Sequence, residues 1–111
     1  MSDHTHTVPA FEDYCRQVAA WAKWDYSKKI IYPALGLAGE AGEVVDRIKK
    51  LYRGDVRRAI GDDEILLELG DVLYYLVSVA RDCGYTMDEV MRANIDKLTA
   101  RHADGYFEAA K

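Results

Sequence analysis

One segment of this 111-residue chain, residues 65–80, limits the possible folds more than any other. As a helix it would be apolar on almost every side, so neighbouring helices would have to cover it all round. Its apolar members include Ile65, Leu66, Leu67, Leu69, Val72, Leu73, Tyr74, Tyr75, Leu76, Val79 and Ala80. A chain of this length builds one modest core and supplies few neighbours for such a helix. We therefore predict an all-α fold completed by homo-oligomerisation, most simply as a homodimer with a shared helical core.

Cap and stop signals divide the chain into about four helices. The pattern predicts helices over 9–24, 33–52, 62–83 and 86–101. Gly54 and Gly84 stand where the second and third helices should end. Thr86 with Glu89 three residues later predicts a capping box at the start of the fourth. We expect a compact helical bundle in one domain, residues 9–107, with tails at 1–8 and 108–111.

The composition argues against several classes of protein. Net charge is −4, and Lys and Arg are scattered, which disfavours a surface for a nucleic acid polymer. A polyanionic ligand would then need a metal cation as mediator. Cys15 and Cys83 stand alone, so neither a zinc site nor a disulfide framework is indicated. No leader or membrane-spanning pattern is present, and we predict a cytoplasmic protein without a membrane partner.

Two acids interrupt the apolar segment. At about 100° per residue, Glu68 falls inside the apolar face, and Asp71 lies at its edge. A buried carboxylate costs several kcal/mol unless it is paired or bound to a metal. No Lys or Arg occurs between Arg58 and Arg81, so positive charge must come from outside this helix.

The second predicted helix has a related pair of acids. Glu40 borders its apolar stripe, and Glu43 lies one step toward the polar face. Three glycines share this helix, at about 1 kcal/mol each relative to Ala, and would permit a close backbone approach. They are Gly36, Gly39 and Gly42.

Acids at i and i+3 share one helix face, so packing the two helices together would gather four carboxylates. Oxygen-only ligands suit Mg²⁺, with Mn²⁺ as a substitute. Two other interpretations stay open. In the first, Glu43 pairs with Arg47 on a solvated face. In the second, cations of another helix neutralise Glu68 and Asp71 in a non-catalytic adaptor. A di-iron site would need Glu-x-x-His pairs, and the sequence contains none.

The fourth predicted helix offers groups for phosphate. Asn94 falls within its apolar stripe, and a buried amide needs hydrogen-bond partners. Lys97 and Arg101 share its edge, so one amide and two cations could face phosphates. The alternative is that backbone groups satisfy Asn94 while both cations lie on a solvated face. The two Trp and eight Tyr residues are expected in the core rather than against a nucleobase.

Taken in order, these residues resemble a known family. Gly36–Glu43, followed after 24 residues by Glu68–Leu76, is similar to the MazG-like all-α nucleoside triphosphate pyrophosphohydrolases, whose hallmark is ExxE and then ExxD. Residues 94–98 and 101–106 also resemble the family's closing segment, so the similarity covers about residues 30–107. The sequence departs from the family at His102-Ala103, where Tyr-Pro is common.

The resemblance implies a Mg²⁺-dependent enzyme that hydrolyses a (deoxy)nucleoside triphosphate to the monophosphate and pyrophosphate. Water would attack the α-phosphorus, with no covalent nucleophile. Glu40, Glu43, Glu68 and Asp71 match the family's metal-binding and catalytic acids. The positions at which the family contacts phosphate or nucleotide fall at Lys49 or Lys50, Asn94, Lys97 and Arg101. The general base is left open among the four acids and Glu64, and the alternative function is a non-catalytic helical dimer that binds nucleotides or acts as an adaptor.

Overall fold

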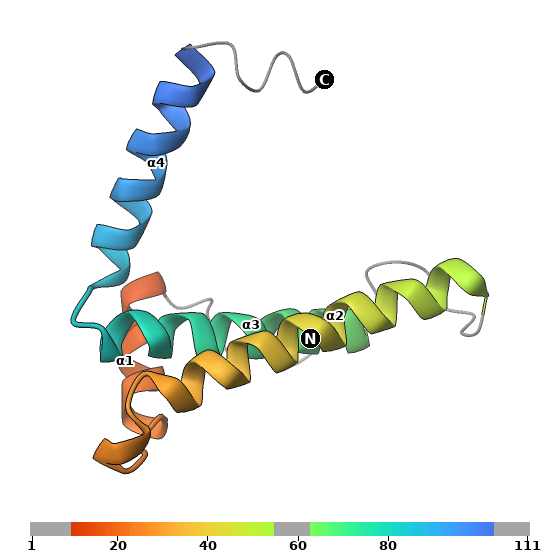
Figure 1. Ribbon diagram of the computed structural model, residues 1–111, viewed down its shortest axis with the longest axis horizontal. Helices are drawn as coiled ribbons and strands as arrows, with labels where there is room; N and C mark the ends of the chain where they lie inside the picture. Colours follow the sequence, from red (N-terminus) through yellow and green to blue (C-terminus); the bar gives the residue numbers. More distant parts are fainter. Residues whose placement is uncertain (1–9, 55–62, 104–111) are drawn as a thin grey trace.

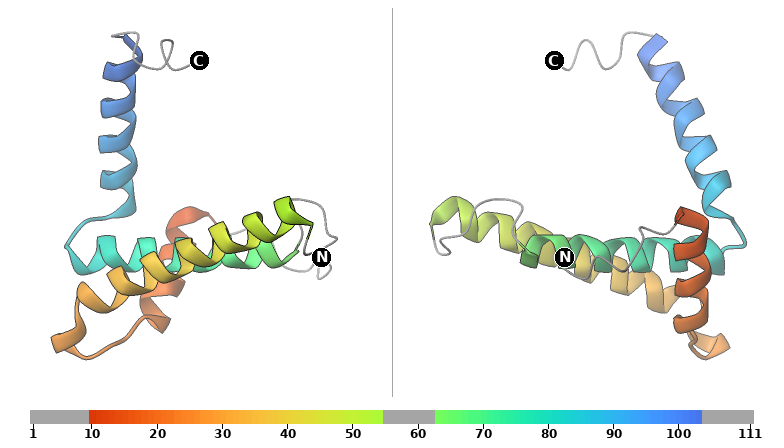
Figure 2. Two further views of the ribbon diagram at one scale, coloured as in Figure 1. Left: turned by 45° about the vertical axis from the view of Figure 1, so that its right-hand side comes forward. Right: turned by 180° about the vertical axis from the view of Figure 1, so that it is seen from behind.

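The computed structural model describes residues 10–54 and 63–103, and these residues form helices without any strand. The order is α1 (Phe11–Trp21), a single 3₁₀ turn η1 (Tyr26–Lys28), α2 (Ile31–Arg53), α3 (Asp63–Asp82) and α4 (Met87–Ala103). Helices α2 and α3 run antiparallel along each other, α1 crosses the end of α3, and α4 extends away from all three (Figures 1 and 2). The predicted all-α class with four helices is confirmed. None of the described helices has the length and apolar character needed to cross a membrane.

The predicted helix ends are confirmed at three places. Gly54 closes α2 in the left-handed region at φ 82°, where a side chain would be strained. Gly84 follows α3 at φ 90°. Its amide donates to Arg81 O over 2.9 Å and the Tyr85 amide donates to Ala80 O over 2.9 Å, which is the Schellman pattern. At α4, the Glu89 amide donates to Thr86 Oγ1 over 3.1 Å and Thr86 N donates to Glu89 Oε1 over 2.8 Å, the reciprocal pair of a capping box.

The first helix is shorter than predicted, because it ends at Trp21 rather than Trp24. Hydrogen bonds with the end of α3 hold the chain where α1 stops. Arg81 Nη2 donates to Ala22 O over 2.7 Å, and Trp24 Nε1 donates to Asp82 Oδ2 over 3.0 Å. These tertiary bonds replace the helical bonds that local sequence would otherwise favour. Pro9, predicted as a first-turn residue, lies outside the described residues.

The buried core lies where α1 crosses α3. Val18 and Ala22 from the α1 side pack against Val77, with aromatic and apolar side chains around them. Ser78 is also fully buried, and its hydroxyl donates to Tyr74 O over 2.8 Å, so its polar group is satisfied within α3. This core packs against the C-terminal half of α3, whereas α2 is the main neighbour along the rest of that helix.

The described part of the chain leaves much of α3 uncovered. Leu66 and Leu67 are 63% and 66% exposed, and Leu69 and Leu76 are also open to solvent. The radius of gyration is 17.0 Å, whereas a compact domain of this length is expected near 13 Å. The described residues of one chain therefore do not by themselves form the compact bundle expected from the sequence.

Helix α4 contributes to this open shape. Its Ile95 is 62% exposed, and Met91 is 41% exposed. Asn94 is exposed as well, so the prediction of a buried amide is wrong for the single chain. The physical reason is that, among the described helices, none runs alongside α4, which extends away from the other three (Figure 1).

Candidate metal centre

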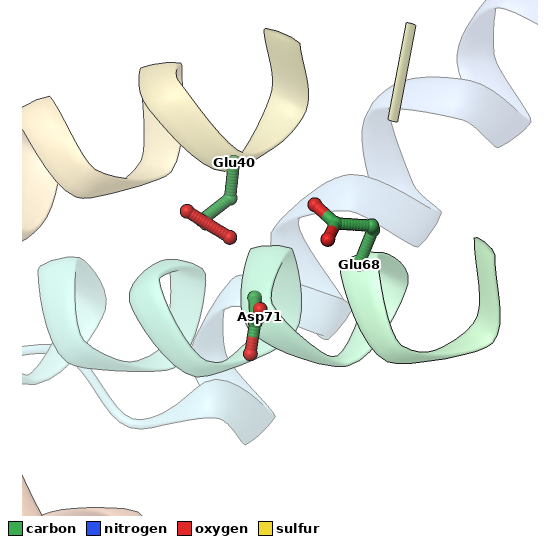
Figure 3. Close-up of side chains that lie close together, drawn as sticks. All are labelled: Glu40, Glu68 and Asp71. Atoms are coloured by element: carbon green, nitrogen blue, oxygen red, sulfur yellow. The ribbon is translucent and has the colours of Figure 1, made fainter. Parts of the chain in front are cut away.

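Three carboxylates meet between α2 and α3. Glu40 extends from α2, and Glu68 and Asp71 come from consecutive turns of α3 (Figure 3). One oxygen from each residue lies within 4.8 Å of the other two. The i and i+3 spacing on α3 places both of its acids toward the same side, as the sequence predicted. The structure therefore brings together three of the four acids expected to form a metal site.

The electrostatics of this group are unfavourable as it stands. Glu68 Oε2 is buried and accepts no hydrogen bond from any described residue. None of the three carboxylates forms an ion pair with a Lys or Arg of the described segments. Partial burial, a hydrogen bond with Asp71 and the negative charges of Asp71, Glu68 and Glu43 raise the pKa of Glu40. Since a buried carboxylate oxygen without a hydrogen-bond partner is costly, a cation bound at this position would stabilise the group.

The helices approach closely one turn from this group. An added Cβ on Gly36 would lie 2.5 Å from Cε1 of Tyr75, so the Tyr75 ring rests directly on the α2 backbone. Gly36 precedes Glu40 by four residues, and Tyr75 follows Asp71 by four. This crossing sets the separation of α2 and α3 where the carboxylates meet. The sequence pattern predicts Tyr75 in the core but does not predict its contact with Gly36, although each residue lies four positions from an acid.

Glu43, the fourth predicted acid, is exposed on α2 and lies outside the group of three. The alternative in which it pairs with Arg47 is not observed. Arg47 instead forms an ion pair with Glu64, which ties α2 to the first turn of α3. Glu64, considered as a general base, is thus engaged in a structural ion pair.

The predicted phosphate-contacting residues do not converge on the carboxylates within one chain. Lys50 pairs with Asp46 at 3.0 Å, and Lys49 lies 3.8 Å from the same side chain. Asn94 and Lys97 line a shallow depression on α4 together with Tyr85. Arg101 also lies on α4, near its end. Helix α4 extends away from the α2–α3 pair (Figure 2), so the groups on α4 lie apart from the three acids within one chain.

The donor set fits a hard divalent cation. All three groups are carboxylates, and carboxylate oxygens suit Mg²⁺ or Mn²⁺ better than softer metals. Such an ion would also give the buried Glu68 Oε2 the partner that it lacks. Three protein oxygens leave coordination positions for water and phosphate, as is usual for Mg²⁺ in phosphoryl-transfer sites.

Comparison with known proteins identifies the family of this chain. Residues 33–106, which include all three acids, match the family described as the MazG nucleotide pyrophosphohydrolase domain. The Gene 37 protein of Mycobacterium phage L5 is 31% identical over 88 residues, covering 78% of this chain and 77% of that protein. No solved structure gives a significant match. With two thirds of its length matched, the chain belongs to the MazG nucleotide pyrophosphohydrolase family.

Proposed function

We propose that this protein hydrolyses a ribo- or deoxynucleoside triphosphate to the monophosphate and pyrophosphate, with Mg²⁺ held by Glu40, Glu68 and Asp71. The observation that carries the proposal is the buried, unpartnered Glu68 Oε2 within a group of three carboxylates. That arrangement is unfavourable without a cation and suited to phosphate chemistry with one. Family membership supports the reaction class.

A bound Mg²⁺ would supply the positive charge that draws the triphosphate to this acidic site and withdraws electrons from its phosphorus. The chain's own residues would fix the geometry. Glu68 and Asp71 sit on one rigid helix, and Glu40 faces them from α2 across a separation set by the Gly36–Tyr75 contact. Water adds to the α-phosphorus, the bond to the bridging oxygen breaks, and pyrophosphate leaves. A carboxylate positioned in this way can orient the water and accept its proton.

We retain Glu43 in the proposal as a fourth acid. It lies one turn after Glu40 on α2, and its charge already raises the pKa of Glu40. A change of side-chain rotamer is the movement that would direct an exposed glutamate toward an ion held by its neighbours. Its contribution is expected to be smaller than that of Glu68, whose oxygen is already buried in the site.

We also propose that the working form is a homodimer. The exposed apolar residues of α3 and α4 form the surface that a second copy would cover. Lys50, Asn94, Lys97 and Arg101 stay as proposed phosphate contacts, with those on α4 serving the carboxylates of the other copy. Light scattering during size-exclusion chromatography should give twice the chain mass of 12.6 kDa, and a stable monomer at micromolar concentration would contradict the proposal.

The competing function is a non-catalytic nucleotide-binding or adaptor module with the same fold. It predicts no turnover and no metal dependence. The distinguishing experiment is pyrophosphate release from a panel of ribo- and deoxynucleoside triphosphates, with Mg²⁺ and with excess chelator. We expect equal amounts of pyrophosphate and monophosphate from at least one substrate, and no release with chelator. Absence of release from the whole panel, with the fold intact, would favour the adaptor.

A further inference from the structure

The connector between α1 and α2, residues 22–30, is held in a conformation that is unfavourable by itself. Ile30 has φ 67° and ψ −54°, and the Ile31 amide donates to Lys29 O over 2.7 Å. This is the rare form of γ-turn, with a β-branched residue at its centre. Such a turn persists only where surrounding contacts hold it in place.

The end of α3 provides those contacts. Oδ2 of Asp82 accepts hydrogen bonds from the Ile30 amide at 2.9 Å and from Trp24 Nε1 at 3.0 Å. Its side chain is only 7% exposed. Burial favours the neutral acid, but the two hydrogen bonds and the charge of Arg81 together lower the pKa of Asp82, so it is a carboxylate at neutral pH. One buried group thus holds two points of the connector.

A series of aromatic contacts leads from this point toward the metal centre. The Trp24 ring lies 5.1 Å from the ring of Tyr32, which lies 6.4 Å from the ring of Tyr75. Tyr75 in turn rests on Gly36, at the crossing that sets the separation of α2 and α3. Disturbing the connector would therefore release the outer end of a packed series whose inner end lies one turn from the carboxylates.

We propose that Asp82 is a positioning residue for the three-carboxylate centre. It holds Trp24 and the strained turn at Ile30, and so keeps Trp24 against Tyr32 and Tyr32 against Tyr75. That packing fixes the spacing of α2 and α3 where the carboxylates face each other. Asp82 lies outside the group of three carboxylates, and the inference rests on the proposed function for the metal ion that this group would hold.

The test uses Trp21→Phe as background, because Trp24 is then the one tryptophan left in the chain. Two measurements are made in that background: the emission of Trp24 and a titration with Mn²⁺ alone. They compare three variants, namely Asp82→Ala, Asp82→Asn and the control Asp25→Ala. Asp25 is a matched control, since it is an exposed connector acid whose carboxylate accepts a local hydrogen bond from the Ser27 hydroxyl, at 2.7 Å. We expect Asp82→Ala to shift Trp24 emission to longer wavelength and to weaken Mn²⁺ binding about tenfold. Asp82→Asn keeps an acceptor oxygen and should recover most of the affinity, and Asp25→Ala should match the background.

Unchanged Mn²⁺ affinity in a folded Asp82→Ala variant would overturn the proposal, as would an equal loss in Asp25→Ala. If Asp82→Ala does not fold, Tyr32→Ala interrupts the same series with Asp82 intact, and wild-type affinity there would also overturn it. Wild-type protein that binds Mn²⁺ in an Asp82-dependent way but releases no pyrophosphate would refute the proposed reaction and leave the positioning role standing. Wild-type protein that binds no Mn²⁺ would refute both.

Discussion

Glu68→Gln is expected to lower kcat/KM for pyrophosphate release by a factor of about 10²–10³, while the metal-free protein becomes more stable. The loss follows because an amide cannot supply the charge that holds the cation. The metal-free protein becomes more stable because Oε2 of the wild-type carboxylate is buried without a hydrogen-bond partner. A neutral amide at that position costs less desolvation free energy, by about 1 kcal/mol or more. Kinetics with saturating Mg²⁺ and denaturant unfolding in chelator measure the two effects on one variant.

Glu43→Gln is the matched control, since it makes the same chemical change one turn from Glu40 on an exposed side chain. We expect a smaller kinetic effect and a change in unfolding free energy within about 0.5 kcal/mol. If Glu68→Gln retained activity, or if it destabilised the metal-free protein as loss of an ordinary ion pair would, Glu68 would have a structural role instead.

The second large effect is expected from Gly36→Ala, a substitution that normally favours a helix by about 1 kcal/mol. Here the added Cβ would meet the Tyr75 ring, with three ring atoms between 2.5 and 2.7 Å away. The ring has little room to yield, because Tyr74 and Tyr32 pack against it with centroids 5.0 and 6.4 Å away. Overpacking of this kind costs about 1–3 kcal/mol and would push α2 from α3 near the carboxylates. A misplacement of about 1 Å there lowers catalysis about 10²-fold.

Gly39→Ala separates this clash from the general effect of Gly on a helix. Apart from its own stretch of α2, no atom of the described residues lies within 4 Å of an added Cβ at Gly39, so this variant should unfold at the same or a higher denaturant concentration. A double variant of Gly36→Ala with Tyr75→Ala should show strong coupling relative to the single changes. Equal stability of Gly36→Ala and Gly39→Ala would mean that the Tyr75 contact does not set the helix spacing.

Much of the fold follows from local signals in the sequence. Gly54, Gly84 and the Thr86–Glu89 pair act over a single turn, so their helix ends are readable without tertiary information. Helical periodicity similarly places Glu68 and Asp71 on one side of α3. The end of α1 was not predictable in this way, because bonds from Arg81 and Asp82, nearly 60 residues away, decide where it stops.

Only part of the candidate site could be predicted, because it depends on contacts between helices as well as on local pattern. Periodicity indicates which acids share a face, but it does not fix the distance between two helices or the rotamer of an exposed glutamate. Glu40 and Glu68 meet across α2 and α3, whereas Glu43 lies outside the group. The position of Asn94 depends on what α4 packs against, and the helical pattern alone does not determine that. The contact of Gly36 with Tyr75 also required tertiary structure, although each residue is one turn from an acid.

The most direct test of the account is the effect of Mg²⁺ on thermal unfolding, compared between wild type and a Glu40→Gln/Glu68→Gln/Asp71→Asn variant. An ion that binds only the folded protein stabilises it by about 2.7 kcal/mol at one hundred times its Kd, or a rise in Tm of about 10 °C. We expect that rise in wild type alone, with the variant unfolding at the same temperature with or without Mg²⁺. An equal Mg²⁺ effect on both proteins, or none on wild type, would contradict the claim that these three carboxylates form the metal centre.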